Sequence, residues 1–172
     1  MDLYLKLTDD QLNIKTTLNK GDIIMKYTVN FLFTPDGKEV LLVKKNKTSY
    51  IGKLNGVGGK CESEETFEQC AIREIREETG AIIPNRSLHY LGTLNLPYDC
   101  VSGPNNNAEI AFYSAIVNKY EVSQQEDEEL VWMDTSILLD TKINNPNLAG
   151  DGDILYMINN ATKYYKWNEK TS

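Results

Sequence analysis

The segment from Gly58 to Ala81, GGKCESEETFEQCAIREIREETGA, constrains the fold more than any other part of this chain. When it is placed on an α-helix at ~100° per residue, its apolar side chains gather on one face. The same spacing puts three glutamates on the next turns of that face. The apolar residues are Phe67, Cys70, Ala71 and Ile75, and the acids are Glu74, Glu77 and Glu78. The segment therefore predicts a helix whose packed side also carries carboxylates.

This pattern differs from an ordinary amphipathic helix, in which acidic side chains lie opposite the apolar stripe. Glutamates at i, i+3 and i+4 are neighbours and repel one another. At partial burial, two like charges ~4 Å apart interact by several kcal/mol at an effective dielectric of about 20. Either the pKa values of the carboxyls rise or a cation neutralises them. Clustered carboxylate oxygens suit hard cations, chiefly Mg²⁺, so we expect such a cation here. A solvated acidic face is the alternative.

A glycine-rich and lysine-rich stretch leads into this helix. The motif NGVGGK at 55–60 has three glycines within four positions. Glycines let the backbone approach a ligand closely, and exposed amides there can bind phosphate oxygens. Five lysines and no acid occupy the stretch 44–60, namely Lys44, Lys45, Lys47, Lys53 and Lys60. Next to a carboxylate-rich helix, this loop indicates phosphates bridged to the protein by metal ions. A tight, solvated connection is the alternative.

The length and charge of the chain limit the class of protein. A chain of 172 residues is most simply one domain, and its net charge of −7 disfavours nucleic-acid polymers and membrane surfaces as partners. No apolar run reaches the ~20 residues that cross a bilayer, and the start of the chain lacks a secretory pattern. Three cysteines with no metal-like spacing favour reduced thiols in a cytoplasmic protein. A homodimer is left open.

The remaining sequence predicts a mixed α/β (α+β) fold. A hairpin is expected from strands at 27–33 and 39–43, joined by a Pro-Asp-Gly turn. Three more strands are predicted within 88–96, 108–117 and 129–135, and a second helix within 153–167. Because strands outnumber helices and do not alternate with them regularly, we expect a mixed sheet packed between helices. Residues 1–20 are expected to form an N-terminal arm before a domain that spans 21–172.

The segment 59–81 resembles the Nudix box, G-x5-E-x7-R-E-U-x-E-E-x-G-U, where U is aliphatic. Gly59 opens the pattern, Glu65 follows at the required spacing, and REIREETGA at 73–81 completes it. Only Ala81 is smaller than the usual residue. The resemblance implies an α-β-α sandwich with a mixed sheet. It also implies a pyrophosphohydrolase that cleaves a nucleoside diphosphate linked to another group, X, by attack of water at phosphorus.

The same resemblance implies roles for the residues of the box. Glu74, Glu77, Glu78 and the carbonyl of Gly59 would coordinate Mg²⁺ or Mn²⁺, and Glu74 is the first candidate for activating the water. Arg73 and Glu65 would orient the box through an ion pair. A further acid from a later loop often completes such a site. The acidic run offers Glu126, Asp127 and Glu128, of which Glu128 is favoured, and a solvated acidic loop is an equal alternative.

The group X is a separate question, because the box reports the reaction and not the substrate. The stretch LNGVGGK resembles nucleoside triphosphate pyrophosphatases, including the branch that removes oxidised purine nucleotides, although Leu54 replaces their tryptophan. The implied substrate is therefore a nucleoside triphosphate, released as monophosphate and pyrophosphate. The implied substrate contacts are Asn55, Gly58, Lys60, Lys44 and Asp151.

Other substrate classes leave traces as well. Tyr98 matches a position typical of dinucleoside polyphosphate hydrolases, and Pro97 one typical of ADP-ribose hydrolases, so these and sugar-nucleotide hydrolases are the alternative. A Nudix domain that senses nucleotides without turning them over is a further alternative. Near the C-terminus, Asp153 fits a helix N-cap better than a base contact.

Overall fold

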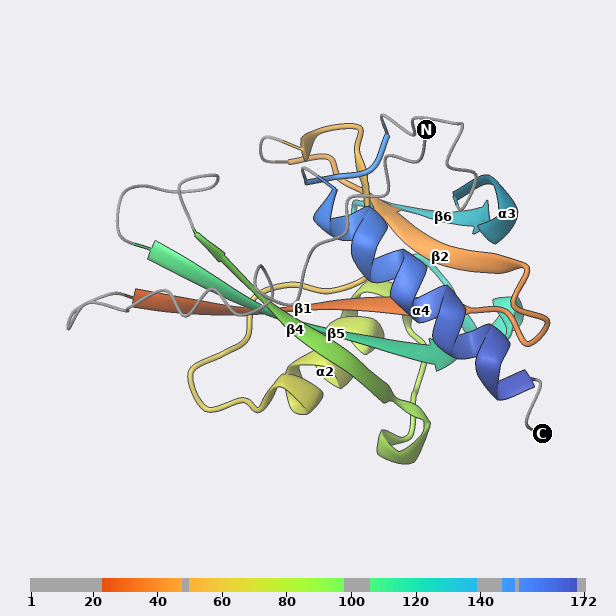
Figure 1. The fold of residues 1–172 in the computed structure, drawn as a ribbon, viewed down its shortest axis with the longest axis horizontal. Coiled ribbons are helices and arrows are strands. Elements are labelled where there is room, and N and C mark those ends of the chain that lie inside the picture. The colour runs from red at the N-terminus through yellow and green to blue at the C-terminus, as the bar shows by residue number, and fades with distance from the viewer. Residues whose placement is uncertain (1–22, 48–49, 98–105, 139–146, 151, 170–172) are drawn as a thin grey trace, which may run out of the picture.

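The computed structural model describes residues 23–47, 50–97, 106–138, 147–150 and 152–169 (Figure 1). Its elements are β1 (Ile23–Phe33), β2 (Glu39–Lys44), β3 (Leu54–Asn55), α2 (Phe67–Thr79), η2 (Asn85–Ser87), β4 (His89–Pro97), β5 (Asn106–Ile116), η4 (Lys119–Glu121), β6 (Glu129–Asp134), α3 (Thr135–Leu138) and α4 (Asp153–Glu169). The predicted hairpin, the three later strands and both long helices are confirmed. The expected arm at 1–20 lies outside the described residues.

The strands form one mixed sheet in the order β3-β2-β1-β5-β4, and β6 pairs with β2 along its whole length, from Glu39 to Lys44. β1 and β5 run parallel over eleven residue pairs, and the other pairings are antiparallel. The parallel pair at the centre explains why the sheet is mixed. The two strands of the predicted hairpin meet in the register Leu32 opposite Leu41 and Phe33 opposite Val40.

Alternation along the central strands sends side chains to two separate cores. Phe31 and Phe33 of β1 pack on the face that α4 covers, together with Met157 and Ile158 of that helix. Leu32, on the opposite face, packs in the cluster that contains Ala71 and Ile75 of α2. In Figure 1 the two helices lie on opposite sides of the sheet. The fold is therefore the expected α-β-α sandwich.

None of the helices in the described part of the chain is long and apolar enough to span a lipid bilayer. Cys61 and Cys70 are both buried and are free thiols, whereas the third cysteine, Cys100, lies outside the described residues. Asp153 lies in the first turn of α4, which agrees with its assignment to a helix start.

Candidate active site

Helix α2 begins and ends with strong local signals. Thr66 caps the N-terminus by accepting a hydrogen bond from the backbone N–H of Gln69, whose side chain accepts one from the backbone of Thr66 in return. At the other end, Gly80 takes the left-handed conformation with φ 70°, and its N–H bonds to the carbonyl of Arg76. These caps fix the length of the helix and therefore the register of its acidic side chains.

The packed face of α2 carries two of the three glutamates. Cys70, Ala71 and Ile75 are fully buried, as the helical periodicity predicted. The Glu78 and Glu74 side chains are only 8% and 13% exposed and continue that face. The Glu77 side chain is 51% exposed. The expectation that all three carboxylates face inward is therefore correct for two of them and wrong for Glu77, which lies at the solvent edge of the face.

The glycine loop covers these two buried carboxylates. The backbone N–H of Gly58 donates a hydrogen bond of 3.0 Å to Oε2 of Glu78. Gly59 lies so close to Glu74 that a Cβ atom at this position would be 2.8 Å from Oε2 of that carboxylate. The loop is tied to strand β1, because the carbonyl of Gly59 accepts from the N–H of Thr28. The motif GG at 58–59 therefore lets the backbone pass directly over the acids.

Asn30 fixes the loop from the sheet side. Its backbone and that of Val57 exchange two hydrogen bonds, and its Nδ2 donates a third to the carbonyl of Val57. The Asn30 side chain is fully buried, which makes these bonds rigid constraints. Sequence reasoning did not single out Asn30, although a lone amide inside the apolar strand YTVNFLF is the signal that could have found it.

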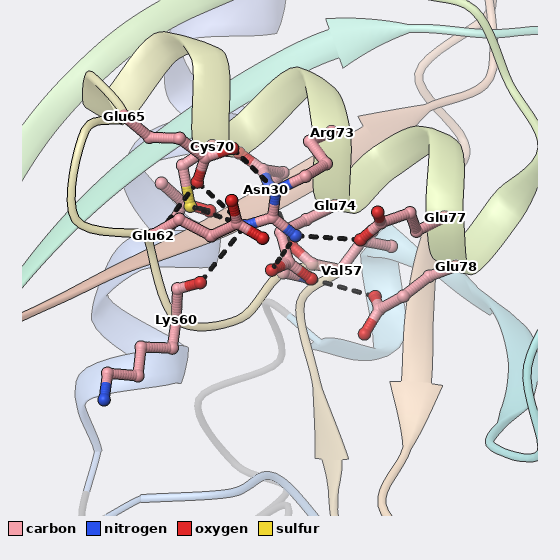
Figure 2. A network of polar contacts seen from close by, with 12 residues as sticks. Asn30, Val57, Lys60, Glu62, Glu65, Cys70, Arg73, Glu74, Glu77 and Glu78 are labelled. Carbon is pink, nitrogen blue, oxygen red and sulfur yellow. Dashed lines mark hydrogen bonds and ion pairs between the residues drawn. The ribbon is translucent and has the colours of Figure 1, made fainter.

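Arg73 is the centre of the polar network in Figure 2. Its Nε and Nη2 contact the two carboxylate oxygens of Glu65 at 2.6 Å and 2.9 Å. Its Nη1 contacts Glu74 at 2.7 Å and Glu77 at 2.8 Å. Nη2 also donates to the carbonyl of Lys60. The predicted Arg73–Glu65 ion pair is present, and the same guanidinium also neutralises part of the charge on the two glutamates of the helix.

Lys45 is a second cation in the site, and the sequence did not single it out. It contacts the carboxylates of Glu78 and Glu128. Its ammonium lies 2.7 Å from Oε2 of Glu128 and 3.9 Å from Oε1 of Glu78. The remaining oxygen of Glu128 accepts from the backbone N–H of Asn46. Lys45 thus joins the helix α2 to the run of residues 125–128, which we call the acidic segment.

Burial raises the pKa of the two acids on the packed face. Loss of solvation raises the pKa of Glu78 to about 7, even though Lys45 and the Gly58 N–H favour its charged form. Loss of solvation also raises the pKa of Glu74, against the opposing effect of Arg73. The charge of Glu126 adds to both shifts, so this carboxylate of the acidic segment acts on the pair. In contrast, Arg73 lowers the pKa of Glu65 to about 2.

The ion pairs leave the site negatively charged. Two cations, Arg73 and Lys45, contact carboxylates that outnumber them, namely Glu65, Glu74, Glu77, Glu78 and Glu128. Within the residues that the structure describes, no three acidic, histidine or cysteine side chains are arranged to hold a metal ion. The donor chemistry fits a hard cation, while side-chain cations occupy the same oxygens in this arrangement.

The residues predicted to contact the substrate do not all lie near the carboxylates. Asn55 lies in β3, where its side chain accepts from the N–H of Gly56. The Lys60 side chain points away from the carboxylates in Figure 2. Lys44 pairs with Glu129 at 3.1 Å on the exposed surface. Asp151, like Tyr98, lies outside the described residues.

A surface cavity of about 660 Å³ adjoins the exposed end of the network. It lies along the solvent side of α2 and reaches both Arg73 and Glu77. Its other lining residues are Gln69, Ile72, Arg76, Asn85 and Gln125. The network is therefore open to solvent on the side of Glu77, while Glu74 and Glu78 lie beneath the glycine loop.

Comparison with known proteins places this geometry in a family. The NUDIX domain family model matches residues 26–149. The uncharacterized Nudix hydrolase YvcI of Bacillus subtilis is 30% identical over 134 residues, which cover 76% of this chain and 77% of that protein. The oxidized purine nucleoside triphosphate hydrolase of Danio rerio is 34% identical over 97 residues, which cover 55% of this chain and 58% of that protein.

Solved structures share the fold at low sequence identity. A MutT/nudix family protein from Enterococcus faecalis superimposes with a TM-score of 0.65 at 18% identity, covering 86% of this chain and 63% of that one. The NUDIX domain of Shewanella oneidensis NrtR, in complex with ADP ribose, superimposes with a TM-score of 0.61 at 18% identity, covering 91% and 97%. The family match, the relatives and the complete box together show that this chain belongs to the Nudix family of pyrophosphohydrolases.

Proposed function

We propose that this protein hydrolyses a pyrophosphate bond in a nucleoside diphosphate linked to a group X, with Mg²⁺ or Mn²⁺ as its cation. One observation carries the proposal: Glu74 and Glu78 are held, almost fully buried, directly beneath the glycine loop at Gly58 and Gly59. Carboxylates that outnumber the neighbouring side-chain cations supply the oxygen ligands that a divalent ion prefers, and the raised pKa values of Glu74 and Glu78 are evidence that their charge is poorly neutralised without one.

Four oxygen donors are proposed to hold the cation. They are the carboxylates of Glu74, Glu77 and Glu78 and the carbonyl of Gly59. As a fifth donor we propose Glu126, which replaces Glu128 as the acid contributed by the later loop. Glu128 is engaged by Lys45 and by the Asn46 N–H, whereas the charge of Glu126 acts on Glu74 and Glu78. When bound, the cation neutralises phosphate oxygens and lowers the pKa of a coordinated water.

The side chains of the box then have distinct tasks. Glu74 is placed to accept a proton, because burial raises its pKa while its carboxylate stays next to the loop. Arg73 and Glu65 set the orientation of the helix against the loop, since the guanidinium spans both. A cation held by Glu74 and Glu77 would compete with Arg73 for their carboxylate oxygens, whereas the Arg73–Glu65 pair would not be involved.

We favour a nucleoside triphosphate as substrate, including an oxidised one, cleaved to the monophosphate and pyrophosphate. The stretch LNGVGGK and the likeness to the oxidized purine nucleoside triphosphate hydrolase of Danio rerio support this choice. In this reading Asn55 contacts the base, and Gly58, Lys60, Lys44 and Asp151 contact the rest of the nucleotide.

A dinucleoside polyphosphate, ADP-ribose or a sugar nucleotide is the second candidate. The NrtR domain with the same fold was solved with ADP ribose. An NAD-capped RNA hydrolase, NudC of Pseudomonas aeruginosa, is 34% identical over 92 residues, and this chain spans 30% of its length. A domain that binds nucleotides without hydrolysis is the third candidate. The complete box supports an enzyme over that reading.

A hydrolysis panel tests the function directly. The panel holds canonical and oxidised nucleoside triphosphates, dinucleoside polyphosphates, ADP-ribose and sugar nucleotides, each with Mg²⁺, Mn²⁺ or EDTA. We expect metal-dependent release of pyrophosphate from a triphosphate and none in EDTA. Release of two monophosphates from ADP-ribose alone would favour the second candidate. Binding without turnover of any compound would favour the third.

The setting of the enzyme is part of the same proposal. We place it in the cytoplasm, where free thiols such as Cys61 and Cys70 stay reduced. Because the chain is acidic, we expect it to act on free nucleotides and to have neither a nucleic-acid polymer nor a membrane as partner. A homodimer is compatible with this setting, and sedimentation of the purified protein decides it. NrtR, one of the proteins with this fold, was also solved with a 27mer DNA. A mobility-shift assay with duplex DNA therefore tests the exclusion of nucleic acid.

A further inference from the structure

The acidic segment is attached to the rest of the protein at both ends. At its start, the backbone N–H of Gln125 donates to the carbonyl of Glu78, at the end of helix α2. At its end, the Glu128 carboxylate accepts from the ammonium of Lys45 at 2.7 Å and from the backbone N–H of Asn46 at 3.1 Å. The chain between these two attachments is short, so its position against α2 is determined.

Glu126 lies between the two attachments. Its negative charge acts on Glu74 and Glu78, which are themselves poorly neutralised. Like charges repel one another. The Glu126 side chain is exposed, but Glu74 and Glu78 are largely buried, which weakens the screening of the repulsion. A free segment would therefore move Glu126 away from α2. Something must hold the segment in place against this repulsion.

Lys45 has the geometry to do so. The side chains of Lys45 and Glu128 are only 19% and 15% exposed, and the ammonium also lies 3.9 Å from Glu78. The adjacent pair, Lys44 with Glu129, joins the same two regions of the chain but is 48% and 62% exposed. Exposed pairs of that kind contribute little, whereas a desolvated pair with a second hydrogen bond constrains both partners.

We propose that Lys45 and Glu128 form a latch that holds the acidic segment against α2, so that Glu126 faces Glu74 and Glu78. Lys45 is then a positioning residue for the cation site and does not touch substrate. The inference rests on the proposed function, because the latch acts on catalysis only if these three acids share a cation.

The latch and the charge of Lys45 alone predict opposite effects of removing Lys45 on the affinity for Mn²⁺. A positive charge close to the site repels Mn²⁺, so its loss would tighten Mn²⁺ binding if charge were its sole effect. If Lys45 positions the segment, its loss releases Glu126 and weakens Mn²⁺ binding. Residues that orient metal ligands typically contribute about 10- to 100-fold to metal affinity.

The test measures the affinity for Mn²⁺ alone, without substrate, from the EPR signal of free Mn²⁺. The variants are Lys45→Met, Lys45→Arg, Glu126→Gln and the double variant Lys45→Met/Glu126→Gln. We expect Lys45→Met to weaken binding about tenfold and Lys45→Arg to recover most of that loss. Glu126→Gln should lower the Mn²⁺ affinity about tenfold in the wild type. In the Lys45→Met background it should lower it less than about twofold, because the latch has already been released.

A matched control separates the latch from the general effect of removing an acid. Glu129→Gln removes the neighbouring, exposed acid and should leave Mn²⁺ affinity within about twofold of the wild type. Thermal unfolding monitors the folding of every variant. If Lys45→Met does not fold, Glu128→Gln takes its place in the double-variant comparison, since it removes the other half of the latch.

Three outcomes contradict the inference. If Lys45→Met binds Mn²⁺ as tightly as the wild type or more tightly, the latch is overturned while the metal site stands. If Glu126→Gln lowers the Mn²⁺ affinity equally in the wild type and in Lys45→Met, the latch is likewise overturned while the metal site stands. If the wild type binds no Mn²⁺, the proposed metal site fails and the latch fails with it.

Discussion

The Nε and Nη2 atoms of Arg73 lie 2.6 Å and 2.9 Å from the two carboxylate oxygens of Glu65. This bidentate pair joins helix α2 to the loop that precedes it. It is partly shielded from water, since the two side chains are 24% and 16% exposed. The same guanidinium reaches Glu74 and Glu77, so one side chain connects the loop to the acidic end of the helix.

The first prediction concerns this bidentate ion pair. Arg73→Lys keeps the charge but cannot form the bidentate pair, so it should lower the free energy of unfolding by about 1–2 kcal/mol in urea titration. Arg76→Lys, on the exposed side of the same helix, is the control and should change it by less than about 0.5 kcal/mol. Equal changes in the free energy of unfolding for the two substitutions would show that the bidentate pair contributes no stability.

The second prediction uses the raised pKa of Glu78, about 7, in the absence of metal. The folded state holds this proton more tightly than the unfolded state, in which the pKa is about 4.5. The stability that this group contributes is therefore present below pH 4.5 and is lost as the pH rises through 7. Glu78→Gln, which cannot ionise, should be more stable than the wild type at pH 8 by about 3 kcal/mol and nearly equal at pH 4.

Urea titrations across this pH range check the prediction. Glu64→Gln, at an exposed position before α2, is the control and should follow the wild-type curve. Parallel curves for the wild type and Glu78→Gln from pH 4 to pH 8 would mean that Glu78 ionises normally in the folded protein.

The third prediction separates turnover from folding at Glu77. Because its side chain is 51% exposed, Glu77→Gln should change the melting temperature little. Turnover of the preferred nucleotide should fall on the order of 100-fold or more, because a proposed cation ligand is lost. Glu68→Gln, an exposed position on the same helix, should keep wild-type turnover. Full activity in Glu77→Gln would remove this residue from the site.

The fourth prediction concerns the close passage of the loop over the sheet. A Cβ at Gly58 would lie 2.2 Å from the backbone oxygen of Thr28, and the φ angle of Gly58 is +146°. Gly58→Ala should therefore destabilise the protein by about 3 kcal/mol or more. Gly52→Ala is the control, with φ +78° and no atom within 4 Å of the new Cβ, and should cost about 1 kcal/mol. Comparable melting temperatures for the two variants would contradict the close approach.

The fifth prediction concerns metal addition and removal. Mg²⁺ should raise the melting temperature by binding the folded state, and EDTA should reverse the rise. The increase should be larger at pH 8 than at pH 5, because protons compete for Glu78 below its pKa of about 7. Glu78→Gln should reduce the increase at both pH values. A rise that does not depend on pH would place the ion away from this carboxylate.

Most of the fold was predictable from local patterns. Helix α2 followed from its apolar period, and its caps at Thr66 and Gly80 were identified only in the structure. The strands followed from short apolar runs bounded by turn residues. The two-residue strand β3 was not predicted, because Leu54 and Asn55 pair with β2 only through contacts made in the tertiary structure.

The site was predictable in part. The box itself is a pattern of spacing, so Glu74, Glu78 and their burial on the packed face could be expected. The outward position of Glu77 could not be expected, because a side chain at the edge of a helical face points inward or outward according to the residues that it contacts. Here that partner is Arg73, which reaches Glu77 from the preceding turn of the helix.

By itself, the sequence determined the α-β-α class, the acidic helix after a glycine loop and the membership of the Nudix family. These features depend on spacing along a short segment, where the helical period and the conformational freedom of glycine decide the outcome. Only the tertiary structure decided which cation serves which carboxylate. Lys45 and Glu128 are 83 positions apart, and any of several lysines could have paired with any of several acids. Charge acts through space, and the strands that bring two charges together are known only once the chain has folded.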